Sequence, residues 1–169
     1  MEIRPALPSD APALAELGGR LFRNAYADQI PLRDMEAYVA TTFTAEAQTA
    51  EIGAPGAAVL VAAEGADLVA YAQLRTAPPP MAWNDPDTLE IARFYLEPRL
   101  HGTGFASSLM GACLDWARQR GQGNAWLQVW EINRRAIAFY VKEGFRDAGQ
   151  TTFQVGNILY RDRVLLRAV

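Results

Sequence analysis

The spacing of hydrophobic residues changes along the chain and divides it into helices and strands. Apolar residues recur at helical spacing near the N-terminus, as at Leu14, Leu17 and Leu21. In the rest of the chain, short apolar runs bounded by glycine, proline or acidic residues indicate strands. Strands are predicted at residues 2–4, 57–64, 68–76, 89–96, 125–130, 145–155 and 159–167. Helices are predicted at about residues 10–26, 32–43, 44–53, 105–120 and 133–143.

The order of these elements predicts the fold class. One strand is followed by two or three helices, three strands, a helix, a strand, a helix and two strands. No internal repeat, low-complexity segment or linker interrupts this order. The sequence therefore predicts a single domain over residues 1–169 of the α/β class, with helices packed against one sheet. A chain of this length can bury a core without disulfides.

A glycine-rich turn stands between the predicted strand 89–96 and the helix that follows it. Its sequence is RLHGTG, from Arg99 to Gly104. Amides at the start of a helix bind anions, and glycines let an anion approach the backbone closely. The turn lacks the lysine of the Walker phosphate loop GxxxxGK[ST], and Ser107 replaces the third glycine of the dinucleotide fingerprint GxGxxG. Neither of these two phosphate-binding motifs therefore describes it.

The turn instead matches the pattern Arg/Gln-x-x-Gly-x-Gly/Ala through Arg99, Gly102 and Gly104. This pattern resembles the pyrophosphate-binding motif of the GNAT superfamily of acetyl-CoA-dependent N-acetyltransferases. The segments LEIARFYL at 89–96 and VWEINRRAIAFYVKEGF at 129–145 are similar to the same family. The resemblance implies the GNAT fold, an α/β fold with a mixed central sheet of about seven strands, splayed between the fourth and fifth and flanked by helices.

The amino-acid sequences of some segments resemble one bacterial subgroup in particular, the spermine/spermidine acetyltransferases. The similar segments are Glu90-x-x-Arg93-Phe94-Tyr95, Trp130-Glu131-x-Asn133, Phe153-x-Val155-Gly156 and Asp162-x-Val164-Leu165. A polyamine is accordingly one candidate acceptor.

The family resemblance also implies a binding site for acetyl-CoA as co-substrate. Amides of the glycine turn would bind its pyrophosphate, and the exposed edge of strand 89–96 would bind its pantetheine arm. Asn133 would hydrogen-bond that arm, in addition to capping its own helix. The expected cofactor-binding residues are Phe94, Tyr95, Leu96, Arg99, Leu100, His101, Gly102, Thr103, Gly104, Phe105, Ala106, Asn133, Ala136 and Phe139.

Acetyl transfer to an amine needs a polarised thioester carbonyl, a neutral amine and a proton for the departing thiolate. Tyr140 is the expected general acid, because it follows Asn133 by two helical turns and shares its face. The alternative is a tyrosine of the core. Glu90 is the expected general base, directly or through water, because a carboxylate within an apolar strand is costly unless it is paired or used. The alternative is a salt bridge with Arg93 or Arg75.

The acceptor is left open by the sequence. The first hypothesis is direct attack by a primary amine of a small molecule in a ternary complex. The second is acetylation of a peptide N-terminus or a protein lysine, and the third is a non-catalytic acyl-CoA sensor, which would need neither Glu90 nor Tyr140. Residues that could line the acceptor pocket are Phe22, Tyr26, Asp28, Trp83, Asp85, Asp87, Trp130 and Tyr160.

Composition and charge exclude several other functions. A net charge of −3 argues against nonspecific nucleic-acid binding. One cysteine and one histidine allow neither an internal disulfide nor a metal site of recognisable spacing, and Cys113 falls on an apolar helical stripe. The N-terminal segment has no apolar core of a signal peptide, and no apolar run suffices for a membrane span. We expect a cytoplasmic enzyme without a membrane or nucleic-acid partner, with a homodimer as the candidate assembly.

Overall fold

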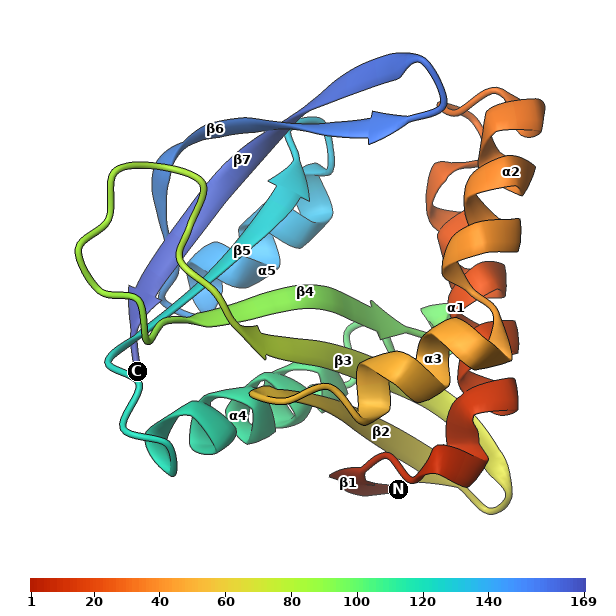
Figure 1. Ribbon diagram of the computed structural model, residues 1–169, viewed down its shortest axis with the longest axis horizontal. Coiled ribbons are helices and arrows are strands. Elements are labelled where there is room, and N and C mark those ends of the chain that lie inside the picture. Colours follow the sequence, from red (N-terminus) through yellow and green to blue (C-terminus); the bar gives the residue numbers. More distant parts are fainter.

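The computed structural model describes residues 1–169 and contains one seven-stranded mixed sheet (Figure 1). The strand order across the sheet is β1-β2-β3-β4-β5-β7-β6. The strands are β1 (Glu2–Pro5), β2 (Ala57–Glu64), β3 (Asp67–Thr76), β4 (Leu89–Leu96), β5 (Asn124–Trp130), β6 (Arg146–Val155) and β7 (Ile158–Ala168). The helices are α1 (Ala11–Tyr26), α2 (Leu32–Thr42), α3 (Ala45–Ile52), α4 (Phe105–Arg118) and α5 (Arg134–Lys142). This confirms the predicted fold class.

Local signals explain why the element boundaries follow the sequence so closely. The Thr44 hydroxyl accepts a hydrogen bond from the Ala47 amide at 3.1 Å and starts α3. Gly121 adopts φ 71° shortly after α4, a conformation that glycine takes without strain. The helix ends at Arg118, two residues before the predicted end. The sequence did not predict the short 3-10 turn Pro98–Leu100 that precedes the glycine turn.

Helices cover both faces of the first half of the sheet. Along β2, Leu60 and Ala62 belong to the large core cluster that includes α4, whereas Val59 and Val61 pack with α1. Successive strand residues point to opposite faces, so α1 and α4 lie on opposite sides of this strand. In Figure 1, α4 lies at the lower left, and α1 and α3 lie at the right. Cys113 is fully buried in the α4 cluster, as predicted.

The sheet opens between its fourth and fifth strands. β4 and β5 are parallel and pair at only two positions, Leu89 with Ala125 and Glu90 with Trp126. Beyond Glu90 the two strands diverge, as Figure 1 shows. The register between β3 and β4 shifts at the same place, which leaves Ala92 as an extra residue in β4. Such a bulge bends its strand, so β4 turns away from β5 and exposes one backbone edge.

No helix of this structure has both the length and the apolar character that a membrane crossing requires.

Candidate active site

A cavity of about 370 Å³ occupies the opening between β4 and β5. One end lies against the glycine turn and the start of α5. The other end is bordered by α1, α2 and the β6–β7 hairpin. Residues from Leu21 to Asp162 therefore contribute to one site, because the splay brings together elements that are far apart in sequence.

The glycine turn presents free amide groups at the first end. Gly102 and Gly104 have φ angles of 78° and 88°, and a Cβ at either position would meet no atom within 4 Å. The amides of Gly102, Gly104 and Ala106 donate no hydrogen bond within the chain. They lie at the N-terminus of α4, where the helix dipole favours negative charge. This arrangement fits a phosphate or pyrophosphate group.

The exposed edge of β4 presents backbone groups to the middle of the cavity. The Glu97 amide donates to the Val69 carbonyl at 3.0 Å, which marks this pair as hydrogen-bonded across β3 and β4. Bonded and non-bonded pairs alternate along an antiparallel ladder. The backbone groups of Phe94 and Leu96 therefore point away from β3, toward the gap, and both residues line the cavity.

Helix α5 supplies the opposite wall. The Asn133 side-chain oxygen accepts a hydrogen bond from the Ala136 amide at 3.1 Å, so the predicted cap is present and the side-chain amino group stays free. Tyr140 lies two turns later, and its ring packs edge-on against that of Phe94, with the ring centroids 6.2 Å apart. Burial raises the pKa of the Tyr140 phenol well above its usual value. The hydroxyl is therefore protonated at neutral pH and makes no hydrogen bond within the chain.

The turn end of the cavity carries the positive charge of Arg135. His101 and Arg135 both line it, and neither forms an ion pair within the chain. Burial and the neighbouring Arg135 charge lower the pKa of His101. A bound anion would be attracted to Arg135 and would favour the protonated form of His101.

Glu90 does not line the cavity, so of its expected roles as a base only the one through water is compatible with this position. The Arg75 guanidinium binds its carboxylate with two hydrogen bonds, one of 2.9 Å to Oε1 and a shorter one to Oε2. The Glu90 side chain is 5% exposed. It sits where β4 and β5 are still paired, before the splay begins. The structure thus shows the salt bridge that the sequence left as the alternative.

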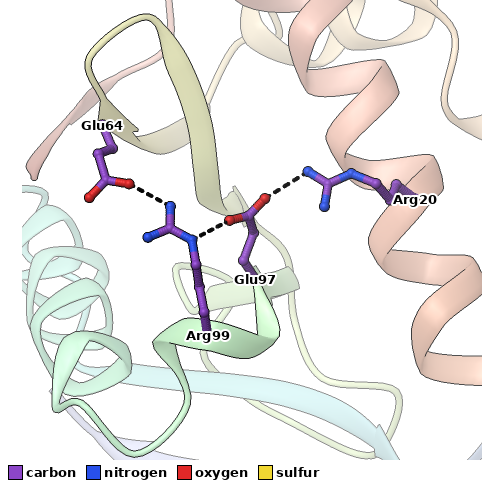
Figure 2. Close-up of polar contacts among 4 residues, drawn as sticks. All are labelled: Arg20, Glu64, Glu97 and Arg99. Atoms are coloured by element: carbon purple, nitrogen blue, oxygen red, sulfur yellow. Dashed lines mark hydrogen bonds and ion pairs between the residues drawn. The ribbon is translucent and has the colours of Figure 1, made fainter.

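Arg99 also does not line the cavity, and its side chain points toward Glu64 and Glu97 (Figure 2). Its guanidinium donates to Glu97 at 2.8 Å and to Glu64 at 2.6 Å. Glu97 in turn accepts a hydrogen bond from Arg20 on α1 at 2.8 Å. The arginine of the turn motif therefore links the turn to the β2–β3 connection and α1. The backbone amides of the glycine turn, and not the Arg99 side chain, face the cavity.

The remaining predicted site residues divide into two groups. Those that line the cavity are Phe94, Tyr95, Leu96, His101, Gly102, Ala106, Asn133, Ala136, Phe139 and Tyr140. Those that do not are Glu90, Arg99, Leu100, Thr103, Gly104 and Phe105. Leu100 is buried in the core, and the Thr103 hydroxyl donates to the Leu100 carbonyl at 2.8 Å. Leu100 and Thr103 therefore stabilise the conformation of the turn without lining the cavity.

The acceptor end contains a carboxylate that the sequence analysis did not assign to the site. Asp162 on β7 lines the cavity and is 6% exposed. Burial, and then the neighbouring Glu131 charge, raises the pKa of Asp162 to about 6. The predicted Phe22, Tyr26, Trp130 and Tyr160 also line this end, whereas Asp28, Trp83, Asp85 and Asp87 do not. The sequence signals for Asp162 were its place within the predicted strand 159–167 and in the segment Asp162-x-Val164-Leu165.

Comparisons with known proteins define the class of protein as an acetyltransferase. The model of the acetyltransferase (GNAT) family matches residues 22–145. An uncharacterized N-acetyltransferase of Mycobacterium tuberculosis is 31% identical over 159 residues, which cover 94% of this chain and 97% of that protein. The chain belongs to the GNAT family, whose members use acetyl-CoA as acyl donor.

Two further similarities are informative. The streptothricin acetyltransferase of Streptomyces lavendulae is 36% identical over 91 residues, 54% of this chain and 44% of that protein. The crystal structure of the PaiA N-acetyltransferase from Thermoplasma acidophilum in complex with coenzyme A superposes with a TM-score of 0.81 at 20% identity, and covers 99% of this chain and 98% of that one. At that identity the second similarity supports the fold.

Proposed function

We propose that this acetyltransferase transfers the acetyl group of acetyl-CoA to a primary amine of a small molecule, by direct attack in a ternary complex. The observation that carries the proposal is that Phe94, with its backbone facing away from β3, and Tyr140 line the same cavity. A backbone donor and a protonated phenol there flank the space for a thioester. This placement also opposes the sensor hypothesis, because binding alone requires no proton donor.

The described residues fit CoA along the length of the gap. The free amides of Gly102, Gly104 and Ala106 would hold the pyrophosphate, with the Arg135 charge beside them. The pantetheine arm would run along the exposed edge of β4, where Phe94 and Leu96 offer backbone groups. The free amino group of Asn133 would donate to a carbonyl of that arm.

The same residues account for the chemistry at the thioester. The Phe94 amide would donate to the carbonyl oxygen as negative charge develops on it. The Tyr140 hydroxyl would donate its proton to the departing thiolate, because its phenol is protonated at working pH and has no other partner. Acid catalysis of this kind contributes roughly 10²–10⁴-fold to the rate.

The dimensions of the site favour a small acceptor. A cavity of about 370 Å³ must hold the thioester end of the donor together with the amine. A relative over 54% of this chain is named for the acetylation of streptothricin, which agrees with an acceptor other than a protein lysine. Acetylation of a peptide N-terminus or a protein lysine is the competing function.

A screen for CoA release tests the proposal. The protein is incubated with acetyl-CoA and with monoamines, diamines, polyamines, aminoglycosides, amino acids or peptides, and free thiol is measured. We expect CoA release with at least one class of small primary amine and none with peptides. Turnover with peptides alone would support the competing function. Binding of acetyl-CoA without turnover on any acceptor would support the sensor.

A further inference from the structure

Asp162 stands out among the groups at the acceptor end. It is the only acidic residue that lines the cavity, and its side chain forms no ion pair or hydrogen bond within the chain. A buried carboxylate without a partner is costly, because it has lost its hydration. Neither the fold nor the chemistry assigned to Tyr140 explains the presence of a buried carboxylate at this position of β7.

The surroundings of Asp162 are aromatic. Trp130 is its direct neighbour across the β5–β7 ladder. The Trp130 ring lies 5.3 Å from that of Tyr160 and 5.7 Å from that of Tyr26. Aromatic faces attract organic cations, and most strongly where water is excluded. Three rings around one carboxylate form a site that suits an ammonium group.

Electrostatic effects connect this site to the proton donor. Burial, and then the Asp162 charge, raises the pKa of Tyr26 to about 12. Tyr26 in turn raises the pKa of Tyr140. Tyr26, Tyr140 and Asp162 all line the same cavity, so Asp162 and Tyr140 border one space.

We propose that Asp162 binds the acceptor in its ammonium form and removes the proton that the amine must lose before attack. This rests on the proposed function and deepens it by naming the acceptor class: a primary amine with one positive charge and an apolar body. It also assigns the proton acceptor that Glu90 does not provide, since Arg75 already occupies that carboxylate.

Asp162 and Tyr140 together account for every proton transfer in the reaction. The ammonium first transfers a proton to the Asp162 carboxylate. The free amine then attacks the thioester carbonyl carbon, so that a C–N bond forms and the C–S bond breaks. The thiolate takes the Tyr140 proton, and the second nitrogen proton restores the Tyr140 phenol. Asp162 releases its proton to solvent, so the products are an amide, CoA and one proton.

The charge of the cavity argues for one ammonium and against a polyamine. Apart from Asp162, the charged groups that line it are arginines, and Arg93 is already paired with Glu51 at 2.6 Å. The exposed acids Asp28 and Asp87 lie outside the cavity. A second ammonium inside would have no carboxylate to pair with, and an unpaired buried charge is strongly unfavourable.

The acceptor class is tested with two amines of equal length. Hexylamine carries one ammonium and 1,6-diaminohexane carries two. We expect kcat/KM to be at least about tenfold higher for hexylamine, and spermidine to be poorer than either, because the second charge is not matched. A tenfold preference for the diamine or for spermidine would overturn the single-charge assignment.

The role of Asp162 is tested with Asp162→Asn and with Asp28→Asn as the matched control on an exposed acid. With hexylamine at pH 7 we expect kcat/KM to fall about 1000-fold in Asp162→Asn, within the range of general-base loss, and to stay within about twofold in Asp28→Asn. Wild-type kcat/KM should rise through pH 6 to a plateau. Asp162→Asn should instead gain about tenfold per pH unit up to the amine pKa near ~10, because only free amine reacts.

The groups that face Asp162 do not produce this profile by themselves. They are Tyr26 of α1, Tyr160 of the same strand, and Glu131, which is paired with Arg161 at 2.9 Å. A loss of activity that is equal at every pH would assign Asp162 a structural role and overturn the proposal. An unchanged profile would overturn it as well.

A binding measurement separates this inference from the proposed function. Hexylamine is titrated at pH 7 into protein saturated with CoA, and heat is measured for wild type and Asp162→Asn. We expect binding that weakens at least about tenfold in the variant. If wild type releases no CoA with any amine yet binds hexylamine through Asp162, the amine site stands and the proposed reaction fails. If wild type acetylates amines and binding does not depend on Asp162, the reaction stands and this inference fails.

Discussion

Trp130 on β5 and Asp162 on β7 are direct partners across an antiparallel ladder, and both side chains line the cavity. Cross-strand partners have Cβ atoms roughly 4.5–5.5 Å apart, so the indole lies beside the carboxylate. One end of the active-site cavity therefore combines an aromatic wall with a negative charge. The other end combines free amides with positive charge, and this polarity fits an anionic donor and a cationic acceptor.

Shortening Trp130 should impair acceptor binding only. For Trp130→Leu we expect KM for hexylamine to rise about five- to thirtyfold, since a desolvated cation–π contact contributes about 1–2 kcal/mol. KM for acetyl-CoA should stay the same, because Trp130 lies at the acceptor end. Steady-state kinetics with each substrate varied in turn measures both. A parallel rise in both KM values would show that the ring supports the whole cavity.

Removing the Tyr140 hydroxyl should slow the chemical step. For Tyr140→Phe we expect kcat to fall about 100-fold, while the calorimetric affinity for acetyl-CoA changes less than about threefold. The hydroxyl makes no hydrogen bond within the chain, so the variant should fold normally. Turnover equal to that of wild type would remove Tyr140 from the mechanism.

The glycine turn offers a matched pair of substitutions. Gly104 and Gly121 both have positive φ, 88° and 71°, and both have open space where a Cβ would be placed. Gly104→Ala and Gly121→Ala should each lower the free energy of unfolding by about 1 kcal/mol through backbone strain. Only Gly104→Ala should weaken acetyl-CoA binding, by about tenfold or more, because it alone distorts the free amides of the glycine turn. Equal affinity in the two variants would contradict the assigned phosphate site.

The Arg75–Glu90 pair should behave as a structural ion pair. Arg75→Gln leaves the buried Glu90 carboxylate without its partner and should lower the free energy of unfolding by roughly 1–3 kcal/mol. The double variant Arg75→Gln with Glu90→Gln should regain part of that loss in a urea titration. Glu90→Gln should keep the wild-type shape of the activity–pH profile. An activity loss that recovers at high pH would instead identify Glu90 as the base.

Asp162 should make stability depend on pH in a direction unusual for a carboxylate. Its pKa is raised to about 6 in the folded state, so between about pH 4 and pH 6 the native state binds more protons than the unfolded state. Stability from this group is therefore present at low pH and is lost as pH rises through 6. Asp162→Asn should unfold with the same free energy as wild type below pH 4, and should be more stable by about 2–3 kcal/mol at pH 7. Parallel pH curves for the two proteins would contradict a buried, unpaired carboxylate.

Much of the fold was predictable because its signals are local. The strands and helices lie within a few residues of their predicted bounds, since glycine, proline and capping residues mark their ends. Asn133 was predicted as a cap and Tyr140 as its neighbour two turns later, and both line the cavity. The acceptor side was less predictable, because α1, α2 and the β6–β7 hairpin contribute to it from opposite ends of the chain.

The sequence by itself determined the order of the elements, the glycine turn and the acyl donor that this turn accommodates. Each depends on residues that are neighbours along the chain, where backbone geometry fixes their relation. Only the tertiary structure decided which charges are paired. Glu90 meets Arg75 across fifteen residues, and Arg99 meets Glu64 across thirty-five. It also decided that Asp162 remains unpaired at the acceptor end, because the energy of a buried charge depends on which distant side chains surround it.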